Sequence, residues 1–165
     1  MTESQRQPVP REDSSESATA LAFLSFARAC LLKKLDGLDE AQVRRRLVDS
    51  DTTLLGLVQH CIDGERYWFD HVVAGNGPDE HDITFDFAVP AERTKDQVIA
   101  DYLAAVAASD AIIEAVGDFD APTARTVDGV PKTMRWVVTH MTSELARHAG
   151  HADILRELID GTTGR

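Results

Sequence analysis

The chain has 165 residues, of which 43% are apolar and 27% charged, and its formal net charge is −11. This length and composition are those of one globular domain with a hydrophobic core. The acidic balance argues against binding to nucleic acid or to an anionic membrane surface, because both require a basic footprint. The basic clusters Lys33–Lys34 and Arg44–Arg46 are short and have acids nearby, so we expect them to be solvated helix surface.

No apolar run approaches the roughly 20 residues that a membrane span needs. The N-terminus is polar and lacks the basic start and apolar core of a secretory signal. Cys30 and Cys61 are too few for a disulfide framework. These features predict a cytoplasmic protein without a membrane partner, and residues 1–16, which carry Pro8 and Pro10, are expected to be a disordered arm.

Helical spacing of apolar residues predicts four long helices, at residues 18–35, 54–74, 94–116 and 133–161, and a short helix at 40–47. Capping residues support several of these ends: Asp39, Thr94 with Gln97 in a capping box, Thr133 and a final Gly161. We therefore predict an all-α fold, a four-helix bundle with a short extra helix and long loops. It would span residues 17–161 and leave a tail at 162–165.

The helix at 54–74 is apolar around most of its girth, which is typical of a central helix. His60 lies on a flank that a neighbouring helix should cover. Cys61 points elsewhere and is expected to be a small core residue. Tyr67 and Trp68 are core residues or the wall of a pocket. His71 lies about 16 Å along the axis from His60, too far to share one ion, and is expected at the surface or at the mouth of a crevice.

The last helix carries His140, Glu144, His148 and His151 in a 4-4-3 spacing. At 100° per residue this spacing places all four within about 80° of arc, on the apolar side with Val137, Leu155 and Leu158. Burying such groups is costly unless something pairs them. A divalent metal ion is one partner, because neutral His and ionised Glu are common ligands. The alternative is a hydrogen-bonded network, or a stripe that lines a wet crevice.

A bundle builds metal sites from side chains on facing helices. His60 from the second long helix could therefore join Glu144 and His148, which lie one turn apart and can converge on one point. Three protein ligands leave a position for water or substrate, the pattern of a catalytic site. An i, i+3 pair can also chelate, so His60, His148 and His151, with Glu144 behind them, remain a competing set.

Two other features bear on the site. Arg28 falls within the leucine stripe of the first helix, where it is either a snorkelling or ion-paired side chain or an inward cation for an anionic ligand. The acidic loop 75–93 contains Phe85 and Phe87, which form a short extended piece or a flap over a neighbouring surface. The apolar surface of this loop and of the second long helix predicts a homodimer.

The segments LGLVQHCIDGERYWF and SELARHAGHADILRELIDG resemble the DinB/YfiT-like superfamily, over residues Leu21 to Asp160. The resemblance is closest to the branch with mycothiol-dependent maleylpyruvate isomerase and uncharacterised relatives. It implies a zinc or nickel ion held by His60, Glu144 and His148. It places His151 where many members carry a glutamine, beside the ligands or facing substrate. His140 would be a wall residue or an alternative ligand.

The resemblance also implies an activity. It points to a divalent-metal-dependent enzyme that activates a low-molecular-weight, mycothiol-like thiol for S-transfer to a small electrophile or for thiol-assisted isomerisation. Arg28 and Arg147 are the cations that could receive a carboxylated cosubstrate, although Arg147 also suits a surface ion pair. The alternative function is a non-catalytic metal-binding module for stress response or for binding a partner.

Overall fold

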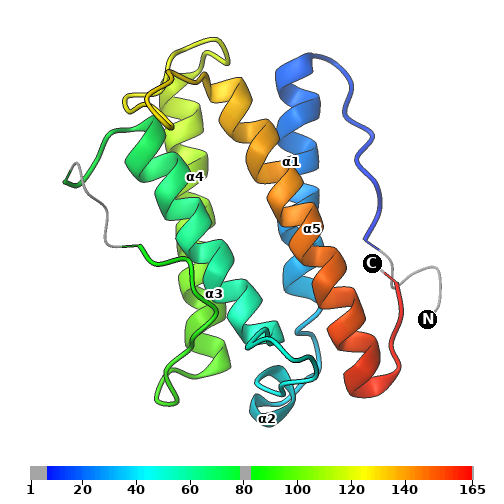
Figure 1. Ribbon diagram of the computed structural model, residues 1–165. Coiled ribbons are helices and arrows are strands. Elements are labelled where there is room, and N and C mark those ends of the chain that lie inside the picture. Colours follow the sequence, from blue (N-terminus) through cyan, green and yellow to red (C-terminus); the bar gives the residue numbers. More distant parts are fainter. Residues whose placement is uncertain (1–6, 79–82, 165) are drawn as a thin grey trace.

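The computed structural model describes residues 7–78 and 83–164, and this part of the chain is helical. The elements are α1 (Glu16–Lys33), α2 (Glu40–Val43), α3 (Leu54–Glu65), the π-helix η2 (Arg66–Val73), α4 (Lys95–Val116) and α5 (Met134–Asp160). The described residues contain two isolated β-bridges, Pro122 with Thr133 and Val127 with Val130, and no strand. The all-α bundle with one short extra helix is therefore confirmed (Figure 1).

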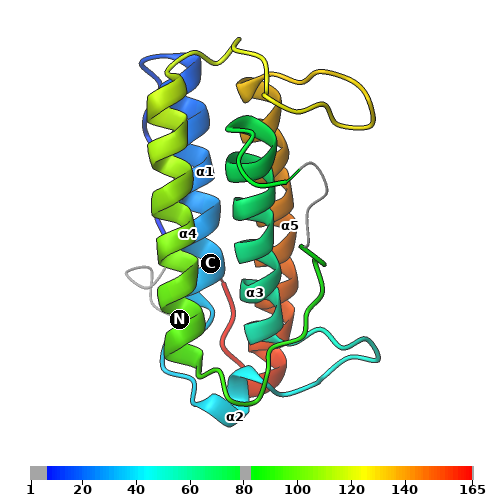
Figure 2. The same cartoon turned by 90° about the vertical axis from the view of Figure 1, so that its left-hand side faces the viewer.

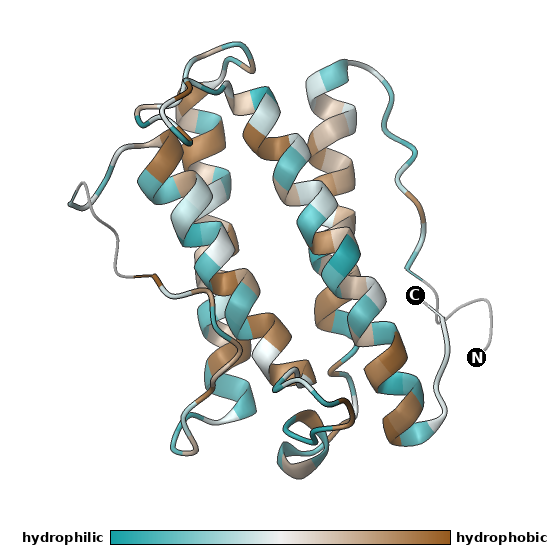
Figure 3. Cartoon of the chain, viewed as in Figure 1, coloured by the Kyte–Doolittle hydropathy of each residue, from teal (hydrophilic) through white to brown (hydrophobic). Residues whose placement is uncertain are grey.

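The four long helices pack with α1 along α5 and α3 along α4, while α3 also contacts α5. Figures 1 and 2 show that α1 and α5 run in one direction and α3 and α4 in the other. Hydrophobic and hydrophilic residues alternate along each long helix, as the colours in Figure 3 show. Leu31, Leu57, Phe69 and Val137 are fully buried between the helices. No described helix is long and apolar enough to cross a membrane.

The predicted caps are confirmed. Asp39 accepts a hydrogen bond from the Gln42 backbone at 2.8 Å, and Thr94 forms a capping box with Gln97. Thr133 caps α5, which ends at Gly161 with a φ of 75°, a left-handed conformation that suits glycine. The first helix begins two residues before its predicted start, because Ser15 accepts a hydrogen bond from the Ala18 backbone.

The second long helix differs from its prediction. It is α-helical only to Glu65 and continues as η2, where Ala74 N–H donates to the Phe69 carbonyl at 3.0 Å, five residues back. A π-turn is wider than an α-turn, so positions after Glu65 rotate away from a 100° projection. His71 is consequently buried and stacks on Tyr67 at 5.5 Å between ring centroids. Of the two places predicted for His71, the surface was wrong. The residue lines a hollow against α4 and not the crevice that contains His60, so it is not at the mouth of that crevice either.

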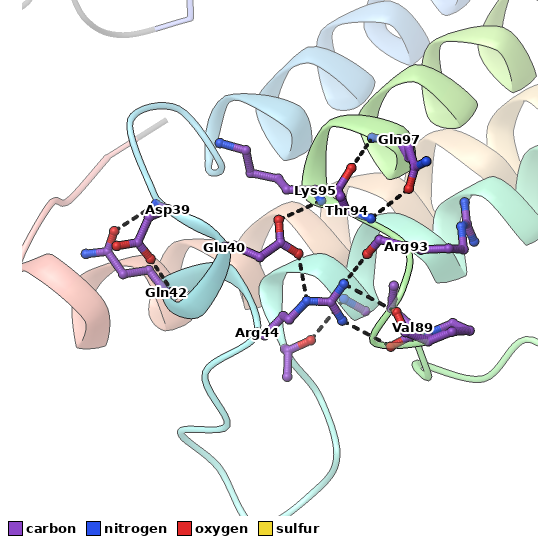
Figure 4. A network of polar contacts seen from close by, with 12 residues as sticks. Asp39, Glu40, Gln42, Arg44, Val89, Arg93, Thr94, Lys95 and Gln97 are labelled. Carbon is purple, nitrogen blue, oxygen red and sulfur yellow. Dashed lines mark hydrogen bonds and ion pairs between the residues drawn. The ribbon is translucent and has the colours of Figure 1, made fainter.

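The connection from η2 to α4 must travel the length of the bundle, since α3 and α4 run in the same direction. Its last residues are held by a polar junction with α2 (Figure 4). Arg44 donates to the carbonyls of Val89, at 3.1 Å, and of Arg93, and pairs with Glu40 at 2.8 Å. Glu40 also accepts from the Lys95 backbone at 2.8 Å. Arg44 is therefore an anchor of the loop, not the solvated surface that was expected.

The other basic cluster also departs from the expectation. Lys34 is buried and forms an ion pair with Asp153 of α5. This contact sets the end of α1 level with Asp153, so the last turns of α5 extend past α1. Leu158, predicted on the core side, is 53% exposed, because it lies on the same flank of α5 as the exposed His151 and Ile154, whereas Leu155 is buried.

Two further predictions concern the surface of a homodimer and the N-terminal arm. Phe87 packs against the core, and Leu54, Leu55 and Leu57 of α3 are buried, so the surface invoked for a homodimer is covered within the chain. The homodimer stays a prediction. Residues 7–14 of the expected N-terminal arm form neither helix nor strand, and its first six residues lie outside the described part of the chain.

Candidate metal centre

Two histidines from facing helices meet in the middle of the bundle. The ring centroids of His60, on α3, and His148, on α5, are 4.7 Å apart, and the ring planes are inclined by 70°. The structure thus brings together the two residues that were predicted to lie on opposite sides of one site.

His148 is 8% exposed, and neither of its ring nitrogens has a hydrogen-bond partner in the described residues. Burial lowers the pKa of His148 to about 4, and the neighbouring His60 adds to this effect, while the Glu144 carboxylate opposes it. At neutral pH the imidazole is therefore uncharged, with a nitrogen lone pair available. A buried polar group without a partner is unfavourable, so we expect a bound group that accepts this lone pair.

His60 is held in a defined tautomer by the loop that crosses α3. Its Nδ1 lies 2.9 Å from the Phe85 carbonyl oxygen, which can only accept, so Nδ1 donates and Nε2 keeps its lone pair. The Phe87 ring stacks on the imidazole, with centroids 4.7 Å apart and planes 18° apart. Of the two alternatives for this loop, a short extended piece or a flap over a neighbouring surface, the structure shows the flap. The contact of His60 with the Phe85 carbonyl could not be predicted from the sequence, because the acceptor is a backbone atom.

Glu144 lies at the edge of this pair. Its Oε2 is 3.7 Å from His148 Nε2, and its Oε1 is 3.2 Å from an Arg147 guanidinium nitrogen. Arg147 is exposed and forms this surface ion pair. The carboxylate therefore stands between a cation and the buried imidazole, one helical turn before it.

The donors fit a divalent ion in kind, since two neutral imidazoles and a carboxylate are typical of zinc and nickel sites. His148 contacts each of the other two donors, His60 and Glu144. Within residues 7–78 and 83–164, no three His, Cys, Asp or Glu side chains are grouped closely enough to enclose an ion. The chemical fit thus depends on His148, which is buried and unpaired, and on the free Nε2 of His60.

The two remaining histidines of the stripe lie apart from this pair. His151 is exposed, with its ring centroid 5.6 Å from that of His148. His140 is half-buried and stacks on Trp136, with centroids 5.0 Å apart and planes 8° apart. Burial also lowers the pKa of His140.

The paired histidines open into a crevice of about 360 Å³. It is lined by His60, Cys61, Gly64, Tyr67, Trp68, Phe85, His140, Met141, Glu144, Leu145 and His148. Burial, with a smaller contribution from the Glu65 carboxylate, raises the pKa of the Cys61 thiol, so this thiol stays protonated and is not a nucleophile at neutral pH. A reacting thiol would have to come from outside the chain.

Arg28 does not line this crevice. Its Nε and one terminal nitrogen donate to the two Glu65 carboxylate oxygens at 2.7 and 2.6 Å, and the other terminal nitrogen donates to Asp110 at 2.7 Å. Arg28 and Glu65 are both buried. Of the alternatives weighed for Arg28, the structure shows the buried ion pair.

A bundle of four long helices, with a histidine of the second facing a Glu-x-x-x-His pair on the last, defines a protein of the DinB/YfiT-like class. Within that class, the model of the mycothiol-S-transferase family matches residues 19–161. The chain therefore belongs to the mycothiol-S-transferase family. A comparison with curated proteins found no match.

Proposed function

We propose that this protein is a divalent-metal-dependent enzyme that activates mycothiol, or a closely similar low-molecular-weight thiol, for S-transfer to a small electrophile. The family match supports a mycothiol-related S-transfer activity. The observation that carries the metal dependence is His148, buried beside His60 with both ring nitrogens unpaired in the described residues. Transfer is favoured over thiol-assisted isomerisation because the matched family is one of transferases.

The proposed ligands are His60, Glu144 and His148, and the proposed ion is zinc or nickel. Such an ion, when bound, lowers the pKa of a thiol that coordinates it and so supplies a thiolate at neutral pH. The chain prepares this chemistry in three ways. Burial keeps His148 neutral, the Phe85 carbonyl orients His60, and the protonated Cys61 does not compete with the cosubstrate.

The same chemistry indicates the compartment in which the enzyme would work. A thiol cosubstrate must be reduced to react, so we place the enzyme in the cytoplasm, where thiols are kept reduced. The net charge of −11 argues against nucleic acid as a partner in this function.

The test is metal content followed by activity. We expect purified protein to carry stoichiometric divalent metal, and His60→Ala and His148→Ala to lose it, since each removes a nitrogen donor. Mycothiol consumption with a generic electrophile should require added zinc or nickel in the metal-stripped protein and should disappear in both variants. His151→Gln is the matched control, because this histidine is exposed and one turn further on.

Glu144→Gln decides the third ligand. Metal loss in Glu144→Gln with retention in His151→Gln supports the proposed set. Retention in Glu144→Gln with loss in His151→Gln assigns the third position to His151. Stoichiometric metal without any thiol consumption would instead support the non-catalytic metal-binding module.

A further inference from the structure

A run of aromatic rings in contact leads away from the paired histidines along the crevice. The Phe85 ring centroid is 6.0 Å from that of His60, and the Tyr67 ring is 5.1 Å from Phe85. The Trp68 ring is in turn 5.0 Å from Tyr67. These rings belong to the flap and to η2, so one side of the crevice is aromatic from the metal centre outward.

The run continues onto the facing helix. Trp68 lies 4.5 Å from His140 of α5, and His140 stacks on Trp136 at 5.0 Å with nearly parallel planes. Trp68 and Trp136 are 5.5 Å apart. Both sides of the crevice thus carry rings at this end. We call Phe85, Tyr67, Trp68, His140 and Trp136 the aromatic run.

The aromatic run is not part of the closed core. Its members all keep some exposure. Phe85, Tyr67, Trp68 and His140 line the crevice. Trp136 does not line it, because its ring stacks on His140 and lies under Lys132 Nζ, 5.1 Å from the ring centroid. Phe69, the next residue after Trp68, shows the contrast, because it is completely buried and belongs to the core cluster. Trp68 packs against that cluster as well, but it also lines the crevice, so part of its ring faces the space where a ligand would lie.

The electron-rich character of these rings indicates which kind of ligand they would bind. Indole and phenol rings are electron-rich, and His140 is an uncharged imidazole at neutral pH because burial lowers its pKa. Electron-rich faces stack best on a flat, electron-poor ring. Among the described residues that line the crevice, Glu144 is the one carboxylate and there is no Lys or Arg. A crevice of about 360 Å³ is of the size that holds a small ring compound.

We propose that the part of the aromatic run that lines the crevice, Phe85, Tyr67, Trp68 and His140, is the binding subsite for the electrophile, and that it takes planar, electron-poor aromatic compounds such as halonitroarenes. The reaction at this subsite rests on the proposed function. A carbon–sulfur bond forms at the ring carbon that bears the halogen, and the carbon–halogen bond breaks. The halide leaves with the bonding electrons, and the thiol proton passes to solvent.

Binding is tested first, without metal or thiol. The chain has two tryptophans, and both belong to the aromatic run, so intrinsic fluorescence reports on the subsite directly. Titration of the metal-stripped protein with 1,3-dinitrobenzene, which lacks a leaving group, should give saturable quenching. An aliphatic nitro compound, nitroethane, should quench without saturation.

Trp68→Leu should raise the dissociation constant for 1,3-dinitrobenzene about tenfold, the change expected from losing one stacking contact. Trp136, whose ring centroid is 5.5 Å from that of Trp68, remains as the reporter in this variant. The matched control is Phe23→Leu, because Phe23 is 39% exposed on α1 and packs on Phe26 outside the crevice. Its affinity should be unchanged. Circular dichroism checks that both variants are folded.

Turnover is tested second, with zinc- or nickel-loaded protein and mycothiol. Trp68→Leu should raise KM for 1-chloro-2,4-dinitrobenzene about tenfold and should raise KM for the non-aromatic electrophile iodoacetamide by much less. Phe23→Leu should leave kcat/KM for both electrophiles unchanged. An equal loss with both electrophiles in Trp68→Leu would show a structural role for Trp68 and overturn the subsite.

The binding and turnover experiments distinguish a failure of the subsite from a failure of the proposed function. Quenching that does not saturate, or equal affinity in Trp68→Leu and the parent protein, overturns the subsite whatever the activity. Saturable binding that Trp68→Leu weakens, with no thiol consumption from either electrophile, supports the subsite and overturns the proposed function.

Discussion

The buried imidazole of His148 makes the stability of the metal-free protein depend on pH. The pKa of His148 is about 4 in the folded chain and about 6.5 in an unfolded one. Protons therefore bind the unfolded state preferentially between these values. Stability is fully present above about pH 6.5 and falls as the pH drops toward 4, by an amount on the order of 3 kcal/mol.

Urea unfolding of the metal-stripped protein at pH 7.5, 6 and 5 measures this dependence. His148→Gln removes the titrating group and should flatten the curve in this window. His140 has a lowered pKa as well, so some slope of the same sign should remain. An unchanged slope in His148→Gln would show that His148 is not the source.

For single residues, the sequence predicts the side of a helix on which a side chain lies, but not how deeply that side chain is buried. The spacing of His140, Glu144, His148 and His151 predicted that all four lie on the apolar side of α5; the first three do line one crevice, but His151 lies outside that lining. It could not tell that His148 is buried while His151 is exposed, because the projection of a helix gives an angle and not the position of its neighbours. The contact of His60 with the Phe85 carbonyl was also beyond it, since main-chain acceptors have no side-chain signature.

Among the elements, the flap depends on a close approach to α3 at Gly56. A Cβ added there would lie 2.5 Å from the Phe87 carbonyl oxygen, a backbone atom that can move only with the flap. We predict that Gly56→Ala lowers the free energy of unfolding by about 1–3 kcal/mol, the usual effect of overpacking. It should also weaken metal binding, because the displaced flap no longer orients His60.

Gly64→Ala is the control for this prediction, since it lies on the same helix and its added Cβ would be 3.6 Å from the Met141 side chain, an ordinary contact. It should be neutral or slightly stabilising, because alanine favours helix over glycine. Denaturant unfolding and metal titration of both variants make the comparison. Equal behaviour of the two would mean that the flap does not rest on Gly56.

The ion pair of Arg28 and Glu65 ties α1 to the second long helix, and Asp110 extends it to α4. Removing one partner leaves the other charge buried. We therefore expect Arg28→Met or Glu65→Leu to lower stability by about 3–5 kcal/mol, and the double variant to recover most of this loss. Chemical denaturation in a double-mutant cycle measures the coupling. Additive losses would show that the two charges act independently.

Element ends were predictable where a side chain caps a helix, as at Thr94 and Thr133, or where a glycine takes a left-handed backbone conformation, as at Gly161. The π-turns after Glu65 were not, because the same residues satisfy an α-helical pattern, and His71 was misplaced as a result. The flap was foreseen only as an alternative. Its position follows from topology, since α3 and α4 run in the same direction and their connection must return along the bundle (Figure 2).

For the whole molecule, the proposed ligands lie on two different helices, so metal binding and folding should be linked. An ion held by His60 on α3 and by Glu144 and His148 on α5 binds the folded chain and not the unfolded one. Zinc or nickel at a thousand times its dissociation constant should then add about 4 kcal/mol to the free energy of unfolding. Chelation should remove this increment.

Thermal unfolding with and without added ion tests the linkage. The parent protein and His151→Gln should both gain stability on addition of zinc or nickel and lose it with a chelator. His148→Ala should show no response, because it keeps only one imidazole at the site. A parent protein whose unfolding temperature ignores both ions would contradict a site that joins α3 to α5. A response that survives in His148→Ala but not in His151→Gln would move the site toward the exposed end of the stripe.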